Sequence, residues 1–352
     1  MISKQSRTKE WILGIRMGAA GKDPILIEKM IMALTLVENL QLSGLDFIFK
    51  GGTSLILLLG RPGRFSIDID IVLPRPQNLD PFFQSVIEQG AFYHYEENRR
   101  PGDLPKQHYK FFFHSVIQNK ESHILLDILF DENPYPVLEK VEIHTPLLSI
   151  EGKATLVSCP IVECLLGDKL TAFAPNTTGI QYGLGKEIEM AKQLFDIGKL
   201  FDAATNVDLI RATFEQIASK ELAYRGRPEL TFTDVLLDSF QTACLIGTRG
   251  AIPGGDYAEL LSGTKKLVAF VYSENFTIDT SILCASKAAY LAGIILKQHT
   301  KIDRFQDNPD IESLNIPNVG YGKLNKLKKT NLEAFFYFYQ SIKLLDLFDD
   351  ER

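Results

Sequence analysis

The spacing of hydrophobic and polar residues changes character part-way along the chain. Between residues 46 and 160, short apolar runs alternate with polar positions, which predicts β-strands. From residue 161 onward, apolar residues recur at intervals of three and four, which predicts helices. We therefore expect an α+β domain over residues 1–160, followed by a mainly helical C-terminal domain over residues 161–352.

The first domain is expected to mix helices and strands. A helical pattern covers residues 25–42, with Asp23 as its cap and Pro24 at its first position. Residues 1–21 mix charges with Trp11 and predict either a helix or a loosely attached arm. The other elements expected here are strands over 47–49, 109–116 and 122–130, helices over 55–59 and 80–90, and edge strands over 142–148 and 155–158.

The second domain carries long apolar patterns of helical period and few strand signals. Its expected helices cover residues 161–174, 187–201, 208–223, 233–247, 257–270, 280–298 and 331–348.

Composition limits the class of protein. A chain of 352 residues with 45% hydrophobic residues can bury a large core. Its net charge of −6 excludes a global basic field for nucleic acid but leaves room for a local basic patch. Four scattered cysteines form no CxxC pair and no zinc spacing, which favours reduced thiols. The N-terminus is too polar for a signal peptide, and no stretch reaches the apolar length of a membrane span, so we expect a cytoplasmic protein without a membrane partner.

The candidate chemistry gathers between residues 46 and 74. A strand ends in Lys50-Gly51-Gly52-Thr53-Ser54, and an apolar helical segment follows. Glycines let backbone N–H groups approach a phosphate, and a helix start adds a favourable dipole. Taken alone, such a sequence is equally well explained as a tight turn without a ligand.

Three carboxylates stand in apolar strands near this turn. Asp68 and Asp70 are two residues apart, so both project from one face of a strand. Two adjacent carboxylates repel each other unless a cation neutralises them, and Mg²⁺ bridging to a phosphate is the natural choice. Asp127 lies in the middle of the apolar strand 122–130, where a carboxylate is costly unless it is paired or bound to metal.

The order of these motifs resembles that of the DNA polymerase β-like nucleotidyltransferases. In detail it is similar to the AbiEii/AbiGii toxin branch, the MenT-like toxins, whose signature is approximately LKGGTaL followed by R.S.DIDf. Residues 49–55 (FKGGTSL) and 64–71 (RFSIDIDI) carry the match here. The resemblance implies a mixed sheet with flanking helices, an NTP substrate, and Mg²⁺ or Mn²⁺ as cofactor.

The same branch carries a lysine-bearing helix and a later acidic helix. Residues 163–172 (ECLLGDKLTA) supply Lys169, and residues 192–197 (KQLFDI) supply Asp196. Gln193 departs from the family pattern, which usually has an acid there. Without the resemblance, Lys169 and Asp196 would be ordinary residues of helix surfaces.

The resemblance also implies a role for each site residue. Asp68, Asp70 and Asp127 would be the metal ligands, with Asp127 holding a second metal or acting as the base. The other expected nucleotide-binding or catalytic residues are Lys50, Gly51, Gly52, Thr53, Ser54, Arg64, Ser66, Lys169 and Asp196. A phosphate on Ser66 would place negative charge where nucleotide and metal must bind.

The implied function is that of a toxin in a toxin–antitoxin (abortive infection) system, which transfers NMP from NTP to RNA and is opposed by a separate antitoxin protein. The expected acceptor is the 3′ end of a tRNA. Two alternatives stay open: a nucleotidyltransferase acting on a small molecule or a protein, and a non-catalytic nucleotide-binding regulatory module. The lysines between 323 and 329, with Tyr321, are either a solvated helix end or an RNA contact. The scattered histidines form no metal-ligand pattern and are expected to be structural or surface residues.

Overall fold

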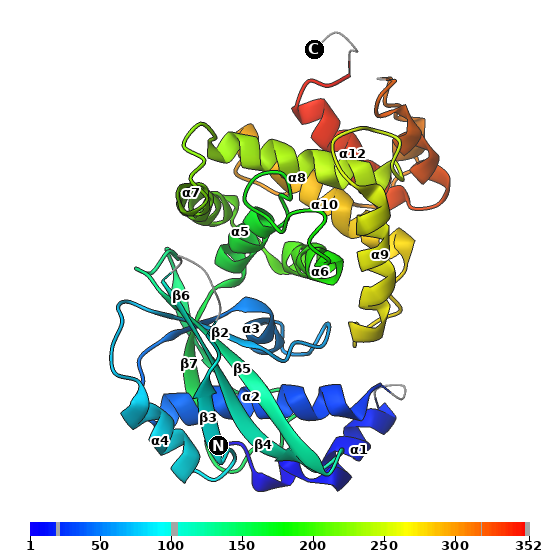
Figure 1. The fold of residues 1–352 in the computed structure, drawn as a ribbon. Coiled ribbons are helices and arrows are strands. Elements are labelled where there is room, and N and C mark those ends of the chain that lie inside the picture. The colour runs from blue at the N-terminus through cyan, green and yellow to red at the C-terminus, as the bar shows by residue number, and fades with distance from the viewer. Residues whose placement is uncertain (19–21, 100–104, 318, 349–352) are drawn as a thin grey trace. The chain divides into compact units, whose positions relative to one another are not determined.

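The computed structural model describes residues 1–18, 22–99, 105–317 and 319–348 (Figure 1). The chain divides into two compact units. The first comprises Met1–Ile161 and the short segment Val271–Glu274, and the second comprises Val162–Phe270 and Asn275–Arg352. The first unit combines a sheet with helices and the second is helical, so the expected α+β class is confirmed.

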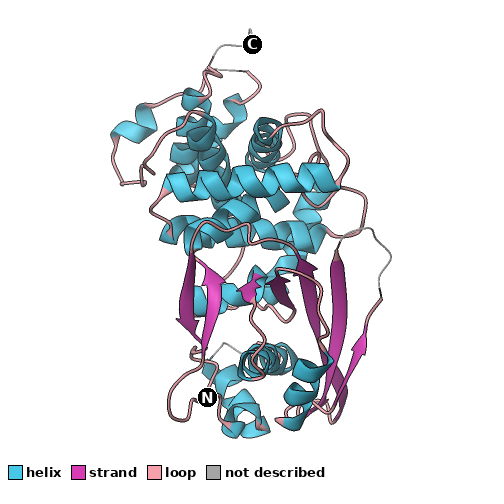
Figure 2. Ribbon diagram, turned by 90° about the vertical axis from the view of Figure 1, so that its left-hand side faces the viewer, coloured by secondary structure: helices cyan, strands magenta, loops and turns pink. Residues whose placement is uncertain are grey.

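A seven-stranded mixed sheet is built from the described residues of the first unit, in the order β3-β4-β5-β2-β1-β7-β6. Its strands are drawn in magenta in Figure 2. Parallel pairing joins β1 to β7 and β2 to β5, and the other neighbours are antiparallel. The strands are β1 (Ile48–Lys50), β2 (Ile69–Leu73), β3 (His94–Glu97), β4 (Lys106–Ser115), β5 (Lys120–Phe130), β6 (Leu138–Glu142) and β7 (Leu156–Pro160).

Of the two edge strands expected after residue 140, the first was misplaced along the chain, and the second is present as β7 but is not an edge strand. Strand β6 ends at Glu142, where the first of them was expected to begin, because Pro146 interrupts the following apolar run and cannot donate to a ladder. Ile143 and Leu147 are instead buried outside any strand. Strand β7 is internal, since β1 pairs with one side of it and β6 with the other. A short apolar run does not reveal how many partners its strand has.

Helices cover one face of this sheet. Phe111 and Phe113 of β4 are buried, and Phe83 of α4 meets Phe111 edge-on at 5.0 Å between ring centroids. The opposite face carries residues such as His108 and Phe112, which are partly exposed. The helical elements of this unit are η1 (Lys4–Arg7), α1 (Lys9–Gly18), α2 (Pro24–Leu42), α3 (Gly51–Leu58) and α4 (Asp80–Glu88).

The start of the chain is a firmly attached pair of short helices. Ser3 donates its N–H to the carbonyl of Ser149 at 2.8 Å, and the Trp11 indole donates to the carbonyl of Leu147 at 2.9 Å. Ile2 also forms a bridge to Ile150. Of the two alternatives for this stretch, the structure therefore has the helix; residues 19–21 lie outside the described part of the chain.

The second unit packs its helices around α10 (Ile278–Leu296), which contacts α6, α8 and α12. With 19 residues, α10 is long and apolar enough to cross a membrane, contrary to expectation, but 78% of its apolar window is buried inside the protein. The other elements are α5 (Val162–Ala172), α6 (Glu187–Ala203), α7 (Val207–Tyr224), α8 (Phe232–Gly247), α9 (Tyr257–Leu267), η2 (Val268–Phe270), α11 (Asp310–Ser313), η3 (Gly322–Lys329) and α12 (Leu332–Leu344).

Candidate active site

A row of charged side chains crosses four neighbouring strands of the first unit. Lys50 of β1 is paired in register with Asp70 of β2, and Asp70 is paired with Asp127 of β5. Asp127 is in turn opposite His108 of β4. Residues paired across strands project from the same face, so the four side chains lie side by side. All four are partly exposed, which leaves this row open to a ligand.

His108 is the member of the row that sequence reasoning missed. Its Nδ1 lies 2.7 Å from Asp127 Oδ1, within hydrogen-bond distance. The signal was available in the hairpin: Ser115 pairs with Lys120, His108 lies seven residues before Ser115, and Asp127 lies seven after Lys120. Counting seven residues away from the turn along each strand therefore predicts that His108 and Asp127 are paired. The burial cost expected for Asp127 is thus met by a partner.

Gly51 explains how Asp70 is placed. Its φ of +79° favours glycine, and a Cβ built on it would lie 2.1 Å from Asp70 Oδ2. The Asp70 carboxylate therefore rests directly against the backbone of the turn that opens α3. A group coordinated by Asp70 would lie beside the N–H groups at the start of this helix, where an anion is favoured.

Gly52 is enclosed by two further residues of the predicted set. A Cβ at this position would lie 2.6 Å from Arg64 Nη2 and 2.8 Å from Ser66 Oγ. Arg64 is only 7% exposed, and its Nη1 donates to the carbonyl of Phe65 at 3.1 Å. Gly52 is thus required because Arg64 and Ser66 approach its backbone closely. The absence of a side chain lets the Arg64 guanidinium lie beside the turn.

Thr53 and Ser54 are buried inside the turn. The Thr53 hydroxyl donates to the carbonyl of Asp68 and lies 2.9 Å from Ser66 Oγ. The Ser54 hydroxyl donates to the carbonyl of Gly51 at 2.9 Å. Both side chains are fully buried: the Thr53 hydroxyl holds the turn to the segment before β2, and the Ser54 hydroxyl closes a bond within the turn itself. The groups that the turn can offer to a phosphate are its backbone N–H groups.

Asp68 lies one residue before β2 and is exposed. Within the described ranges, no three His, Cys, Asp or Glu side chains come close enough together to hold a metal ion. The donor set nevertheless fits Mg²⁺, which proteins hold through one or two carboxylates while water and substrate phosphates complete its shell. Asp70 and Asp127, adjacent in register, are that pair of carboxylates.

The segment Val271–Glu274 supports Arg64 from the outside. Val271 forms a bridge with Arg64, and the Tyr272 N–H donates to the Gly63 carbonyl at 2.9 Å. The Tyr272 ring meets Phe65 edge-on at 5.6 Å. Sequence reasoning assigned these residues to the helical domain, and nothing in their pattern indicates a return to the first unit.

A sequence model described as "Nucleotidyl transferase AbiEii toxin, Type IV TA system" matches residues 35–246, more than half of the chain. The chain belongs to the AbiEii family. It is therefore a nucleotidyltransferase-family enzyme and a toxin of a type IV toxin–antitoxin system. The matched range contains every residue of the row and of the glycine turn.

Solved structures give more distant similarities. MenT4, a nucleotidyltransferase toxin from Mycobacterium tuberculosis H37Rv, is 13% identical with a TM-score of 0.44, over 93% of this chain and 98% of that one. JHP933 from Helicobacter pylori is 16% identical with a TM-score of 0.43, over 85% and 95%. At TM-scores below 0.5, the family assignment rests on the sequence model alone. No protein with a curated description matches this chain.

The AbiEii-type residues Lys169 and Asp196 both lie in the second unit. Lys169 Nζ is 3.1 Å from Asp196 Oδ2 and donates to Gln193 Oε1 at 3.0 Å. The two charged side chains are 11% and 2% exposed. Gln193, where this chain departs from the family pattern, thus takes part in the same cluster as an acceptor. Asp196 is the partner of Lys169, and their roles in the reaction remain a prediction.

The lysines near residue 325 lie on η3, with Lys323, Lys326 and Lys329 exposed. Tyr321 packs on Phe240 at 5.9 Å between ring centroids, and burial raises the pKa of Tyr321 to about 12. The Tyr321 ring is therefore engaged in the core of the second unit, which weighs against its stacking on an RNA base.

Proposed function

We propose that this AbiEii-family chain transfers NMP from an NTP to an RNA acceptor, with the 3′ end of a tRNA as the expected site of attachment. The observation that carries the proposal is the adjacent pair Asp70 and Asp127 beneath the glycine turn. A carboxylate pair beside a helix N-terminus fits a metal–triphosphate complex.

In this proposal the turn and Arg64 bind the triphosphate. Backbone N–H groups at the start of α3 donate to phosphate oxygens, and the Arg64 guanidinium, close to Gly52, compensates charge that develops on the leaving pyrophosphate. Lys50, at the end of the row, adds a positive charge next to Asp70. Such catalysis depends mostly on positioning and electrostatics.

The carboxylates of Asp70 and Asp127, with Asp68 as the third, would hold Mg²⁺ or Mn²⁺. Bound there, the ion would polarise the α-phosphate and stabilise the leaving group. Asp127 would hold a second metal or accept a proton from the attacking hydroxyl. His108 is a positioning residue for Asp127, because it fixes one carboxylate oxygen at 2.7 Å.

The remaining expectations follow from the family. Transfer to RNA would arrest growth, and the antitoxin protein encoded with such toxins would oppose it. Ser66, beside Gly52 and hydrogen-bonded within the turn, is the hydroxyl at which an added phosphate would repel the triphosphate.

The proposal is tested by incubating the protein with each α-labelled NTP and Mg²⁺, with total tRNA or without RNA, beside the Asp68→Ala variant. We expect label on tRNA with the wild type only. Label on a small molecule or on the protein itself would replace the RNA acceptor by one of the alternatives. Nucleotide binding without transfer of any label would support the non-catalytic module.

Induced expression provides an independent test of the toxin assignment. Cells producing the wild type should stop growing, and cells producing Asp68→Ala at the same level should continue. Equal growth of both cultures would contradict a toxic nucleotidyltransferase.

A further inference from the structure

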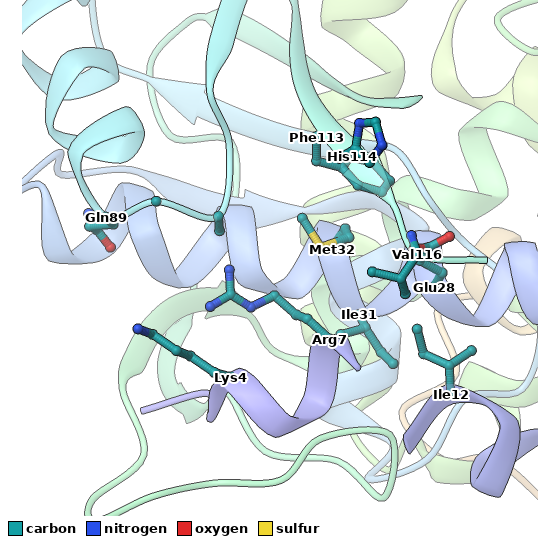
Figure 3. Close-up of a pocket in the computed structure, with 12 residues that line it drawn as sticks. Lys4, Arg7, Ile12, Glu28, Ile31, Met32, Gln89, Phe113, His114 and Val116 are labelled. Atoms are coloured by element: carbon teal, nitrogen blue, oxygen red, sulfur yellow. The ribbon is translucent and has the colours of Figure 1, made fainter. Parts of the chain in front are cut away.

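Two adjoining cavities lie in the first unit, away from the row formed by Lys50, Asp70, Asp127 and His108, which we call the catalytic row. One has a volume of about 650 Å³ and the other about 370 Å³. Lys4, Arg7, Gln89 and Ala91 line both of them, so the two cavities share a wall, and we refer to them together as the pocket. Figure 3 shows Arg7 extending from η1 toward α2, with Glu28, Ile31 and Met32 along the opposite wall. Either volume suits a small-molecule ligand.

The pocket is separate from the candidate active site. Phe113, which lines it, is five residues from His108 on the same strand. Side chains alternate between the two faces of a strand, so Phe113 and His108 project to opposite faces. The other lining residues belong to the N-terminal segment 1–12, α2, the turn after α4, the end of β4 (His114, and Val116 just after the strand) and the loop at Glu151 and Gly152. None of them is a residue of the catalytic row.

Two of the three acidic side chains that line the pocket, Glu28 and Glu38, are already engaged by the protein, and the third, Glu151, is exposed. Glu28 accepts from the Val116 N–H at 2.7 Å and from the Ser115 hydroxyl. Glu38 accepts from the Ile2 N–H at 2.8 Å and from the Thr155 hydroxyl at 2.8 Å. These bonds stabilise both carboxylates as part of the wall.

The cationic groups are in a different situation. Lys4 and Arg7 line both cavities from η1, and no ion pair within 4.0 Å joins either of them to an acid among the described residues. Burial lowers the pKa of Arg7, and the Glu38 carboxylate acts in the opposite direction. A partly desolvated guanidinium with a planar set of donors suits an oxyanion, which can accept two parallel hydrogen bonds from it.

Asn39 provides the second, independent observation. It lines the larger cavity and is only 5% exposed, yet its Nδ2 finds no hydrogen-bond partner among the described residues. The backbone carbonyl of the same residue is satisfied, since Gln89 Nε2 donates to it at 3.1 Å. A buried amide donor without an acceptor is costly, and an oxygen atom of a ligand would satisfy it.

The donors are held in place before any ligand binds. Ser6 sits between Lys4 and Arg7, and its hydroxyl donates to the Ser149 carbonyl at 3.1 Å and accepts from the Ser149 N–H at 2.8 Å. Asn39 belongs to α2, in which nearly every neighbouring residue is buried. A site whose donors are already ordered loses less entropy on binding.

We propose that this pocket binds a small metabolite bearing a phosphate or carboxylate group, which accepts hydrogen bonds from the Arg7 guanidinium and from Asn39 Nδ2. The site is independent of the proposed nucleotidyl transfer. Its occupant would connect η1 to α2 and so stabilise the first unit.

The test is a titration of the full chain with inorganic phosphate or with citrate, without divalent ions, followed by the thermal unfolding midpoint. We expect a saturable rise with at least one probe in the wild type and in Arg16→Gln, which alters an exposed arginine of α1 outside the pocket. Arg7→Gln should weaken the apparent affinity about tenfold. A response to phosphate alone or to citrate alone would identify which oxyanion the pocket takes.

A second variant keeps the proposal falsifiable if Arg7→Gln unfolds. Asn39→Leu removes the unsatisfied donor, so without ligand it should melt above the wild type, and its response to the probe should be reduced. No saturable response of the wild type to either probe would overturn the proposal. So would a response of Arg7→Gln and Asn39→Leu equal to that of the wild type.

Discussion

At the scale of single residues, functional side chains of the AbiEii site lie so close to Gly51 and Gly52 that neither position has room for a Cβ. Asp70 rests against Gly51, and Arg64 and Ser66 rest against Gly52, so each glycine leaves space for a functional group. Motif spacing was enough to predict the residues on both sides of these contacts. It could not predict that Thr53 and Ser54 are fully buried, because the direction of a hydroxyl depends on the segment that packs over it.

The Gly52→Ala variant tests this close packing. The added methyl group would displace the Arg64 guanidinium, which lies at the end of a flexible side chain, so the fold should tolerate the change. We expect transfer activity to fall about 10- to 100-fold, because a displacement of this size spoils positioning. The control is Gly14→Ala on α1, where an added Cβ meets nothing within 4 Å. Equal activity of the two variants would show that Arg64 placement is unimportant.

His108→Gln tests the positioning of Asp127. Loss of the imidazole should lower the rate about 10- to 100-fold, the usual effect of removing a partner that orients a metal ligand. Nucleotide binding should change much less, because His108 is not expected to contact the triphosphate. His144→Gln, at an exposed histidine, is the matched control. Wild-type turnover by His108→Gln would leave the 2.7 Å contact without a catalytic purpose.

At the scale of elements, hydrophobic periodicity predicted most helices and strands. It could not predict which elements far apart in the sequence pair with each other. Helix α2 and strand β5 have strong periodic patterns and were predicted within two residues. The position of β7 inside the sheet, and the return of Val271–Glu274 to the first unit, depend on contacts far apart in sequence. The local sequence of Val271–Glu274 does not indicate that backbone N–H groups of this segment donate to the Gly63 carbonyl.

The helices α5 and α6 are linked by the buried pair Lys169 and Asp196. Removing one partner leaves a buried charge unpaired, so Lys169→Met or Asp196→Leu alone should destabilise the fold by about 3–5 kcal/mol. The double variant Lys169→Met/Asp196→Leu should recover most of this loss, measured by denaturant unfolding. If Lys169 acts on the triphosphate, as the family resemblance implies, the stable double variant will still be inactive. Wild-type activity of the double variant would make the pair purely structural.

At the scale of the whole molecule, the chain consists of an α+β unit that carries the glycine turn and the carboxylates, and a helical unit built around α10. The change in the spacing of hydrophobic residues near residue 160 predicted an α+β part followed by a helical part. The sequence reading was wrong in one respect: no stretch was expected to reach the apolar length of a membrane span, yet α10 does, and 78% of its apolar window is buried in the packed unit. Apolar length alone cannot distinguish a membrane span from a central core helix.

The metal expected at Asp70 and Asp127 gives a prediction for the whole molecule. Both carboxylates are partly exposed on neighbouring strands, while the buried core of the first unit is mainly apolar, so we expect the ion to serve the reaction and not the fold. Treatment with EDTA should abolish nucleotidyl transfer and leave the thermal midpoint unchanged, and added Mg²⁺ or Mn²⁺ should restore activity. A large drop in the midpoint would instead reveal a structural metal.

The measurement that tests the central claim most directly is the rate of labelled nucleotide transfer by Asp70→Asn and Asp127→Asn, compared with the wild type and with Asp307→Asn at an exposed aspartate. Each substitution keeps the shape of the side chain and removes its charge. We predict that both site variants stay folded and lose transfer at least about 100-fold, while Asp307→Asn retains it. Wild-type transfer by either folded site variant would contradict a catalytic centre built on the adjacent pair Asp70 and Asp127.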